Sequence, residues 1–142
     1  MNIAFFFTPK IDLVYMNVNS TMRQALEKME FHRYTAIPLV DDNGKYVGTL
    51  TEGDLLWNIK NTPSLSFKNT QDIRLSDISL YNINEPVSIN AEIEDLFSRA
   101  IDQNFVPVVD DNDTFIGMVK RKEIIEYCAK TILKEKINYS TI

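Results

Sequence analysis

Hydrophobic and polar positions along the chain follow one order, and that order occurs twice. In each half, a short apolar segment precedes a stretch with apolar residues at positions i, i+3, i+4 and i+7, a spacing typical of an amphipathic helix. A strand, a polar turn, a second strand and a second helix follow. The strand–turn–strand segments, PLVDDNGKYVGTL at 38–50 and PVVDDNDTFIGMV at 107–119, are identical at six of 13 positions. This repetition predicts two copies of one β-α-β-β-α unit.

The pattern also predicts where most elements begin and end. In the first copy, Thr21 and Gln24 have the spacing of a capping box at the start of a helix, and Asn90 is the expected cap in the second copy. The other expected elements are apolar pieces at 13–18 and 87–89, strands at 36–40 and 105–109, turns at 41–44 and 110–113, and second helices at 52–59 and from 121 to about 133.

A polar stretch separates the two copies. We assign residues 1–60 to the first copy, 61–72 to a linker that carries Pro63, and 73–142 to the second copy with its terminal helix. Residues 73–80 are expected to form a short helix leading into the second copy. Because a unit of about 60 residues buries too little surface to be stable alone, the two copies should pack as a pseudo-twofold α+β pair that shares one core.

Composition narrows the range of functions. The net charge of −5 and the pI of about 4.9 argue against nucleic acid as the main partner, since a phosphate backbone requires a basic face. The single cysteine, Cys128, cannot form an internal disulfide and is expected to be a buried core thiol in a reducing compartment. The apolar run at 3–7 is too short to span a membrane. We therefore expect a cytoplasmic protein without membrane association.

Catalytic and metal-binding patterns are not found in the sequence. One histidine, His32, and one cysteine are too few for a zinc site of the usual ligand count, and neither residue has the setting of a nucleophile–base pair. Glycine-rich phosphate loops are also absent. We therefore expect a protein that is not an enzyme and uses no metal and no cofactor.

The segment GTLTEGDLL at 48–56 carries the clearest candidate chemistry. Thr51 and Asp54 stand almost one helical turn apart at an expected helix start, so both can face the same direction. The free N–H groups of a helix start suit a phosphate, and a carboxylate can accept hydrogen bonds from ribose hydroxyls. The alternative is that Thr51 only caps the helix and Asp54 only complements its dipole. In the second copy Lys120 and Glu123 occupy the equivalent positions, with Arg121 and Lys122 between them.

Taken together, the doubled pattern, the proline within each first strand (Pro38 and Pro107) and the Gly48-x-x-Thr51-x-x-Asp54 motif resemble a pair of CBS domains, over about residues 1–134. The resemblance implies a regulatory module that binds an adenosine-containing nucleotide in clefts built from both copies. It also implies a homodimer that pairs through its helices and acts on a separate, regulated protein.

The resemblance assigns residues to two clefts. In the first, Thr51 and Asp54 would face the segment at 104–107 together with Val87. The members of that segment are Asn104, Phe105, Val106 and Pro107. In the second, Lys120, Arg121, Lys122 and Glu123 would face Val14, Tyr34, Thr35, Ala36, Ile37 and Pro38.

A narrower resemblance concerns the ligand. Stand-alone bacterial CBS-pair proteins that bind cyclic di-AMP carry a stretch similar to the one from Tyr34 to Pro38, and two basic residues matched here by Arg121 and Lys122. Lys120 departs from that pattern, because those proteins tend to carry a hydroxyl there. The sequence therefore does not decide whether the ligand is AMP, ATP or cyclic di-AMP, or whether one cleft or both bind it.

Two expectations about single residues follow from the assigned clefts. Asp54, as an exposed residue of a first turn, should contribute little to stability, and Arg121 should bind ligand phosphate. The competing interpretation of the whole chain is a structural or dimerisation module whose clefts are filled by side chains such as Phe105 and Tyr34.

Overall fold

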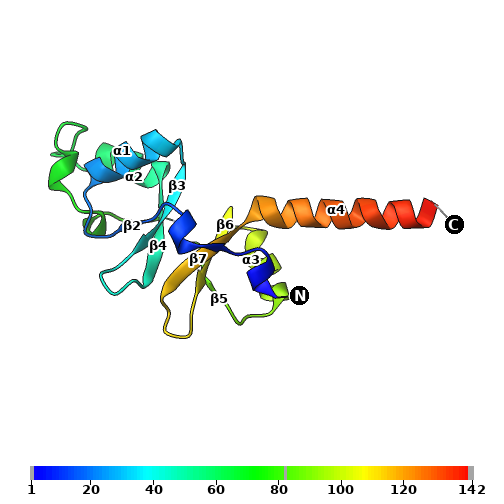
Figure 1. Cartoon of the computed structure of the whole chain (residues 1–142). Coiled ribbons are helices and arrows are strands. Elements are labelled where there is room, and N and C mark those ends of the chain that lie inside the picture. Colours follow the sequence, from blue (N-terminus) through cyan, green and yellow to red (C-terminus); the bar gives the residue numbers. More distant parts are fainter. Residues whose placement is uncertain (1, 82, 141–142) are drawn as a thin grey trace.

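The chain folds into two similar halves, each a small sheet covered by helices (Figure 1). The computed structural model describes residues 2–81 and 83–140. The first half contains β2 (Met16–Asn17), α1 (Met22–His32), β3 (Ala36–Val40), β4 (Tyr46–Thr51) and α2 (Glu52–Asn61). The second half contains β5 (Val87–Ser88), α3 (Ile93–Ala100), β6 (Phe105–Val109), β7 (Phe115–Lys120) and α4 (Arg121–Ser140). The predicted β-α-β-β-α order is confirmed in both halves.

Strand register shows that the two halves are copies of one unit. In each, a short parallel strand and an antiparallel hairpin form the sheet, β2-β3-β4 in one and β5-β6-β7 in the other. Each hairpin has a register shift at the same repeat position, between Leu39 and Val40 and between Val108 and Val109. The two hairpins also meet each other, through a bridge between Lys45 and Thr114.

Helix starts differ between the copies. Thr21 and Gln24 form the predicted capping box at α1. The prediction for Asn90 is wrong, because α3 begins after Glu92, whose side chain makes no capping hydrogen bond. Instead, Asn90 N donates to Ser88 Oγ at 3.1 Å and Ala91 N donates to Ser88 O at 3.0 Å, so residues 88–91 form a turn before the helix begins.

The helix predicted at 73–80 does not form; the whole segment between α2 and β5, which extends the assigned linker, is called the linker from here on. It contains two single turns, η3 (Thr70–Asp72) and η4 (Leu75–Asp77). The reason is that its backbone is bonded to the first half: Met22 N donates to Ile73 O, and Leu75 N donates to Ser20 O, both at 2.8 Å. Backbone groups used in this way cannot complete a longer helix.

The segment that precedes each copy lies against the other copy. At the N-terminus, η1 (Ile3–Phe5) packs into the core of the second half, and β1 (Thr8–Pro9) pairs with β7 before η2 (Lys10–Asp12). The linker packs into the core of the first half through residues such as Leu65 and Leu75. Equivalent glycines permit both crossings. A Cβ on Gly117 would lie 2.3 Å from Thr8 O, and a Cβ on Gly48 would lie 2.9 Å from Leu80 Cδ1.

The hydrophobic core consists of two clusters, one per half, and not of the one shared core that we predicted. Each sheet faces its own helices and buries its apolar face there. Phe115 contributes to the contact between the halves, because its ring centroid lies 5.8 Å from that of Tyr15 and 6.2 Å from that of Tyr46.

α4 begins on the second half and then extends away from the body of the molecule (Figure 1). Cys128 lies on this helix and is only partly buried, which corrects the prediction of a fully buried thiol. Its place explains the difference, because α4 leaves the second half soon after this residue. Across the described residues, we find no helix that combines the length and apolar character of a membrane span.

Candidate functional site

A cavity of about 290 Å³ lies where the two halves meet. Both copies contribute to it, through the start of β3, the start of β6 and the junction of β7 with α4. The lining residues are Asp12, Leu13, Val14, Tyr34, Ala36, Pro38, Asn104, Phe105, Met118, Lys120 and Lys122.

Strand alternation decides which residues reach the cavity. Successive side chains of a strand point to opposite faces. Tyr34, Ala36 and Pro38 line the cavity, while Ile37 is fully buried in the core of the first half. Met118 and Lys120 line it in the same way on β7. Sequence reasoning missed Met118, although its place two residues before Lys120 on one strand was a usable signal.

Charged side chains of both signs line the cavity. Lys120 and Lys122 come from the end of β7 and the first turn of α4. The Lys122 ammonium lies 3.9 Å from Glu126 in a solvent-exposed pair, which holds the lysine only weakly. Asp12, at the end of η2, adds a carboxylate that sequence reasoning also missed. The two lysines can therefore bind an anionic group of a ligand, and the carboxylate of Asp12 can accept hydrogen bonds from a ligand.

Arg121 does not line this cavity. Its Nε donates to Ala100 O at 2.7 Å and to Gln103 O at 2.9 Å. These carbonyl oxygens lie at and just beyond the end of α3, where they lack helical partners. The Nε–H therefore joins the end of α3 to the start of α4.

Thr51 and Asp54 also lie outside the cavity lining. They form a capping box at α2: Asp54 N donates to Thr51 Oγ1 at 3.1 Å, and Thr51 N donates to Asp54 Oδ2 at 2.9 Å. Asp54 is only 3% exposed, and its Oδ1 accepts from Tyr81 N at 2.9 Å. The expectation that Asp54 is exposed is therefore wrong, because the linker passes over α2 and bonds to its carboxylate.

The other predicted residues are distributed between core and surface. Val87 and Val106 are buried in the core of the second half, and Pro107 is buried beside them on β6. Thr35 is exposed, and its carbonyl accepts from Glu52 N at 3.0 Å. Glu123 is partly buried on α4. Among the residues predicted for the first cleft, only Asn104 and Phe105 line the cavity.

Tyr46 connects the first hairpin to the linker, with its hydroxyl 2.9 Å from both Asn84 O and Thr49 Oγ1. Burial raises the pKa of Tyr46 from 10.0 to about 12, against a smaller lowering by the Thr49 hydrogen bond. The neutral hydroxyl thus stabilises the fold fully below pH 10, and this contribution is lost as pH rises from about 10 to 12.

We expect Tyr46→Phe to remove this part of the pH dependence. Two pKa units correspond to roughly 2–3 kcal/mol of unfolding free energy. Urea denaturation of the parent and of Tyr46→Phe, at pH 9 and at pH 11.5, measures how much unfolding free energy each protein loses between the two pH values. An equal loss of unfolding free energy in the two proteins would show that Tyr46 does not cause this pH dependence.

The chain belongs to the CBS domain family. The family's sequence profile, described as CBS domain, matches residues 7–61 and 76–130, which together make up more than half of the chain. These two segments correspond to the two halves of the fold.

Curated relatives carry regulatory and catalytic names. Cyclic di-AMP receptor B of Bacillus subtilis is 24% identical over 125 residues, covering 84% of this chain and 81% of that protein. Inosine-5'-monophosphate dehydrogenase of Methanocaldococcus jannaschii is 24% identical over 115 residues, covering 81% of this chain. The chain spans only 21% of that enzyme's length.

Solved structures share the fold. CbpB in complex with c-di-AMP superposes with a TM-score of 0.86 at 17% identity, covering 98% of this chain and 91% of that one. CBSX2 in complex with AMP superposes with a TM-score of 0.71 at 22% identity, covering 92% and 97%. At these identities the likeness establishes the tandem CBS fold alone.

Proposed function

We propose that this protein is a regulatory module that binds an adenine nucleotide in the cavity between its two halves. The observation that carries the proposal is the composition of this cavity. Lys120 and Lys122 provide positive charge for a phosphate, while Tyr34 and Phe105 provide aromatic surface for a base. Relatives named for cyclic di-AMP and a structural neighbour with AMP support the same ligand class.

The size of the cavity favours a single adenosine phosphate. Small-molecule sites range upward from about 300 Å³, and this one has about 290 Å³. AMP therefore suits this volume better than the larger cyclic dinucleotide. A ligand that couples its binding to the spacing of the halves can shift the population of conformations that a regulated protein recognises.

We infer one nucleotide site per chain, because the two copies carry different residues at equivalent positions. In the second copy, Lys120 replaces the threonine that caps α2 in the first copy, and its side chain lines the cavity. In the first copy, the oxygens of Asp54 already accept hydrogen bonds from Thr51 N and Tyr81 N. A second ligand on Asp54 would have to displace the linker.

Thermal shift and calorimetry with AMP, ADP, ATP and cyclic di-AMP test the proposal. Ligand at about a hundred times its dissociation constant should stabilise the fold by roughly 2.7 kcal/mol. We expect Lys120→Glu/Lys122→Glu to weaken AMP binding at least tenfold, while uncharged adenosine changes far less. Lys130→Glu, on exposed α4 outside the cavity, is the matched control and should bind like the parent.

Two results would overturn the proposal. No shift from any nucleotide would favour the structural module instead. Equal AMP binding by the parent and by Lys120→Glu/Lys122→Glu would place a bound nucleotide elsewhere in the protein.

A further inference from the structure

Three aromatic side chains lie together at the end of α1, next to the cavity. The rings of His32 and Tyr34 are stacked, with centroids 5.2 Å apart and an angle of 16° between their planes. Phe31 meets His32 edge to face, with centroids 4.9 Å apart and an angle of 85°. Of these three side chains, that of Tyr34 lines the cavity.

The backbone at the end of α1 explains why two residues so close in sequence can stack. Within a helix, residues i and i+2 do not face each other. Here α1 ends at His32, and Arg33 adopts the left-handed conformation, with a φ of 58°. The next residue, Tyr34, donates its N–H to Met29 O at 3.0 Å. This turn fixes the Tyr34 backbone against α1 and places its ring beside that of His32.

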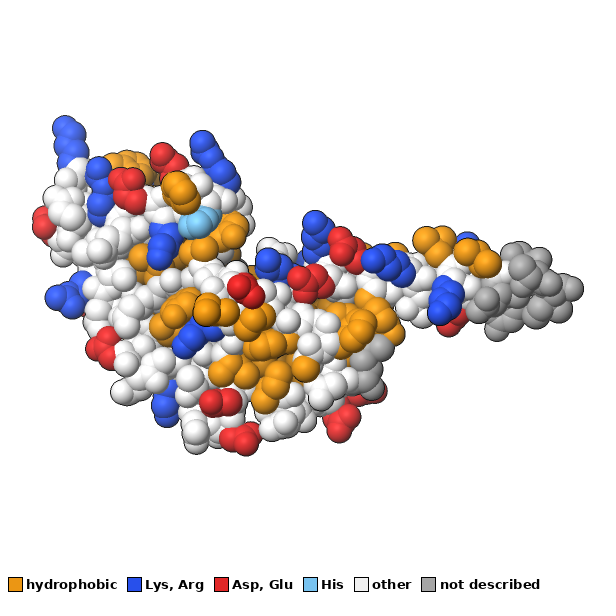
Figure 2. Space-filling model, viewed as in Figure 1, with side chains coloured by type: hydrophobic (Ala, Val, Ile, Leu, Met, Phe, Trp, Pro, Cys, Tyr) orange, Lys and Arg blue, Asp and Glu red, His pale blue; other side chains and the backbone are white. Residues whose placement is uncertain are grey.

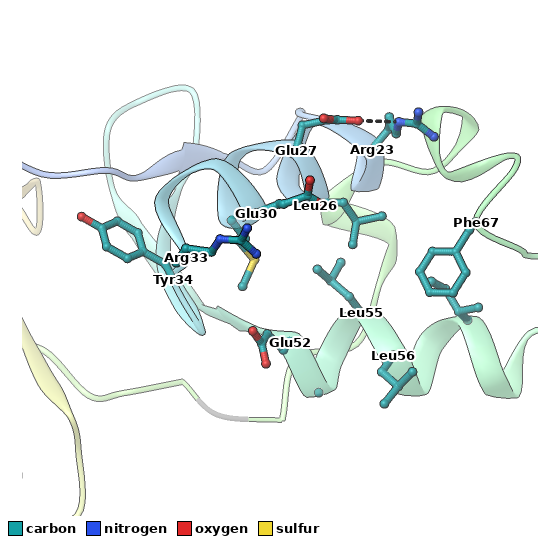
Figure 3. Close-up of a pocket in the computed structure, with 13 residues that line it drawn as sticks. Arg23, Leu26, Glu27, Glu30, Arg33, Tyr34, Glu52, Leu55, Leu56 and Phe67 are labelled. Carbon is teal, nitrogen blue, oxygen red and sulfur yellow. Dashed lines mark hydrogen bonds and ion pairs between the residues drawn. The ribbon is translucent and has the colours of Figure 1, made fainter.

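His32 holds a ring that would otherwise be exposed on several sides. Tyr34 is 42% exposed, and Figure 3 shows its ring pointing away from Leu26 and Leu55, the apolar side chains between α1 and α2. Among the residues that the structure describes, ring contact with Tyr34 is made by His32 alone. His32 is the one histidine of the sequence, and Figure 2 shows it in pale blue at the surface of the first half, among apolar side chains.

The stack leaves part of the Tyr34 ring uncovered at the cavity. An aromatic ring has two faces, and His32 covers one of them. The surface of Tyr34 that lines the cavity is therefore available to a second flat ring, such as the base of a nucleotide. A base stacked there would extend the existing series of rings by one member.

We propose that His32 is a positioning residue of the nucleotide site, and that it holds the Tyr34 ring in the orientation that stacks on the base. This inference rests on the proposed function. A ring that rotates freely loses that freedom when a ligand stacks on it, and this loss weakens binding. A ring already held by His32 has lost that freedom before the ligand arrives. His32 itself does not line the cavity, so it acts through Tyr34 and not by touching the ligand.

Calorimetry with AMP on the full chain measures the effect of His32→Ala. We expect AMP binding to weaken about threefold to tenfold, the range that corresponds to ordering one side chain on binding. Thermal unfolding should change little, because alanine favours a helix more than histidine does. His32→Phe keeps a flat ring that can stack and should restore AMP binding to the level of the parent. Lys28→Ala is the matched control: it removes an exposed side chain one turn earlier on α1 and should bind AMP like the parent.

A double-mutant cycle then tests whether His32 acts through Tyr34. In the background of Tyr34→Ala, the further change His32→Ala should leave AMP binding unaltered, because the ring that His32 holds is gone. A loss as large as that in the parent background would show that His32 acts independently of Tyr34, and would overturn the inference. Equal AMP binding by the parent and by His32→Ala would overturn it as well.

Failure of the proposed function gives a different result. In that case the parent binds no nucleotide, or Lys120→Glu/Lys122→Glu binds AMP like the parent, and the role of His32 is overturned with it. Binding that depends on the two lysines but is the same in His32→Ala would leave the nucleotide site in place and overturn only the role of His32.

Discussion

Replacing Phe115 by alanine should lower the free energy of unfolding by about 3–5 kcal/mol, the range for truncation of a buried phenylalanine. Phe115 is fully buried, although it belongs to neither of the two core clusters. Its ring lies between Tyr15 and Tyr46 of the first half, while its N–H donates to Gly44 O at 2.9 Å. The substitution therefore creates a void at the junction of the halves.

Chemical denaturation of Phe115→Ala and of Val47→Ala measures this effect. Val47 is a matched control because it lies on the equivalent hairpin of the first half and is 41% exposed, so its truncation should cost less than about 1 kcal/mol. Since the proposed nucleotide cavity depends on the spacing of the halves, AMP binding should fall in Phe115→Ala as well. A loss below about 1 kcal/mol would show that Phe115 does not stabilise the contact between the halves.

Asp54→Ala should destabilise the fold by about 2–4 kcal/mol. The variant loses the helix cap, worth about 1 kcal/mol, and leaves the N–H groups of Thr51 and Tyr81 without their carboxylate acceptor in a partly buried place. The loss should also release the linker from α2. Asp54→Asn keeps one carbonyl oxygen in the site and should be intermediate.

Glu123→Ala is the matched control, because Glu123 occupies the same repeat position in the second copy and is only partly buried. We expect a change within about 1 kcal/mol. Thermal unfolding of Asp54→Ala, Asp54→Asn and Glu123→Ala measures these changes in stability. Equal, small losses from Asp54→Ala and Glu123→Ala would show that the buried hydrogen bonds of Asp54 contribute little.

Sequence reasoning predicted the strands and hairpins well because their signals are local. The strands β3 and β6 occupy the predicted residues 36–40 and 105–109, since a short continuous apolar run next to a polar turn specifies a hairpin without distant contacts. The cap of α1 was predicted for the same reason, because the side chains of Thr21 and Gln24 each bond the other's backbone three residues away. The prediction of Asn90 as a cap was wrong because residues 88–91 form a turn, after which α3 begins only at Ile93.

The candidate site was predicted in part. Tyr34, Ala36, Pro38, Lys120 and Lys122 were assigned to one cleft, and the cavity brings them together. Asp12 was missed because it precedes the first repeat and reaches the cavity only through the crossing of the N-terminal segment. The environment of Asp54 was also unpredictable, since its partner Tyr81 lies 27 residues away in a linker without a regular pattern.

By itself, the sequence determined the doubled unit together with its hairpins and main helices, because periodicity and turn chemistry act over a few neighbouring positions. Only the tertiary structure decided that the cores are separate, that each leading segment crosses to the other half, and that Arg121 and Asp54 bond to backbone. These outcomes depend on contacts between residues far apart in the chain, where packing and unsatisfied polar groups select one partner among several that the local pattern allows.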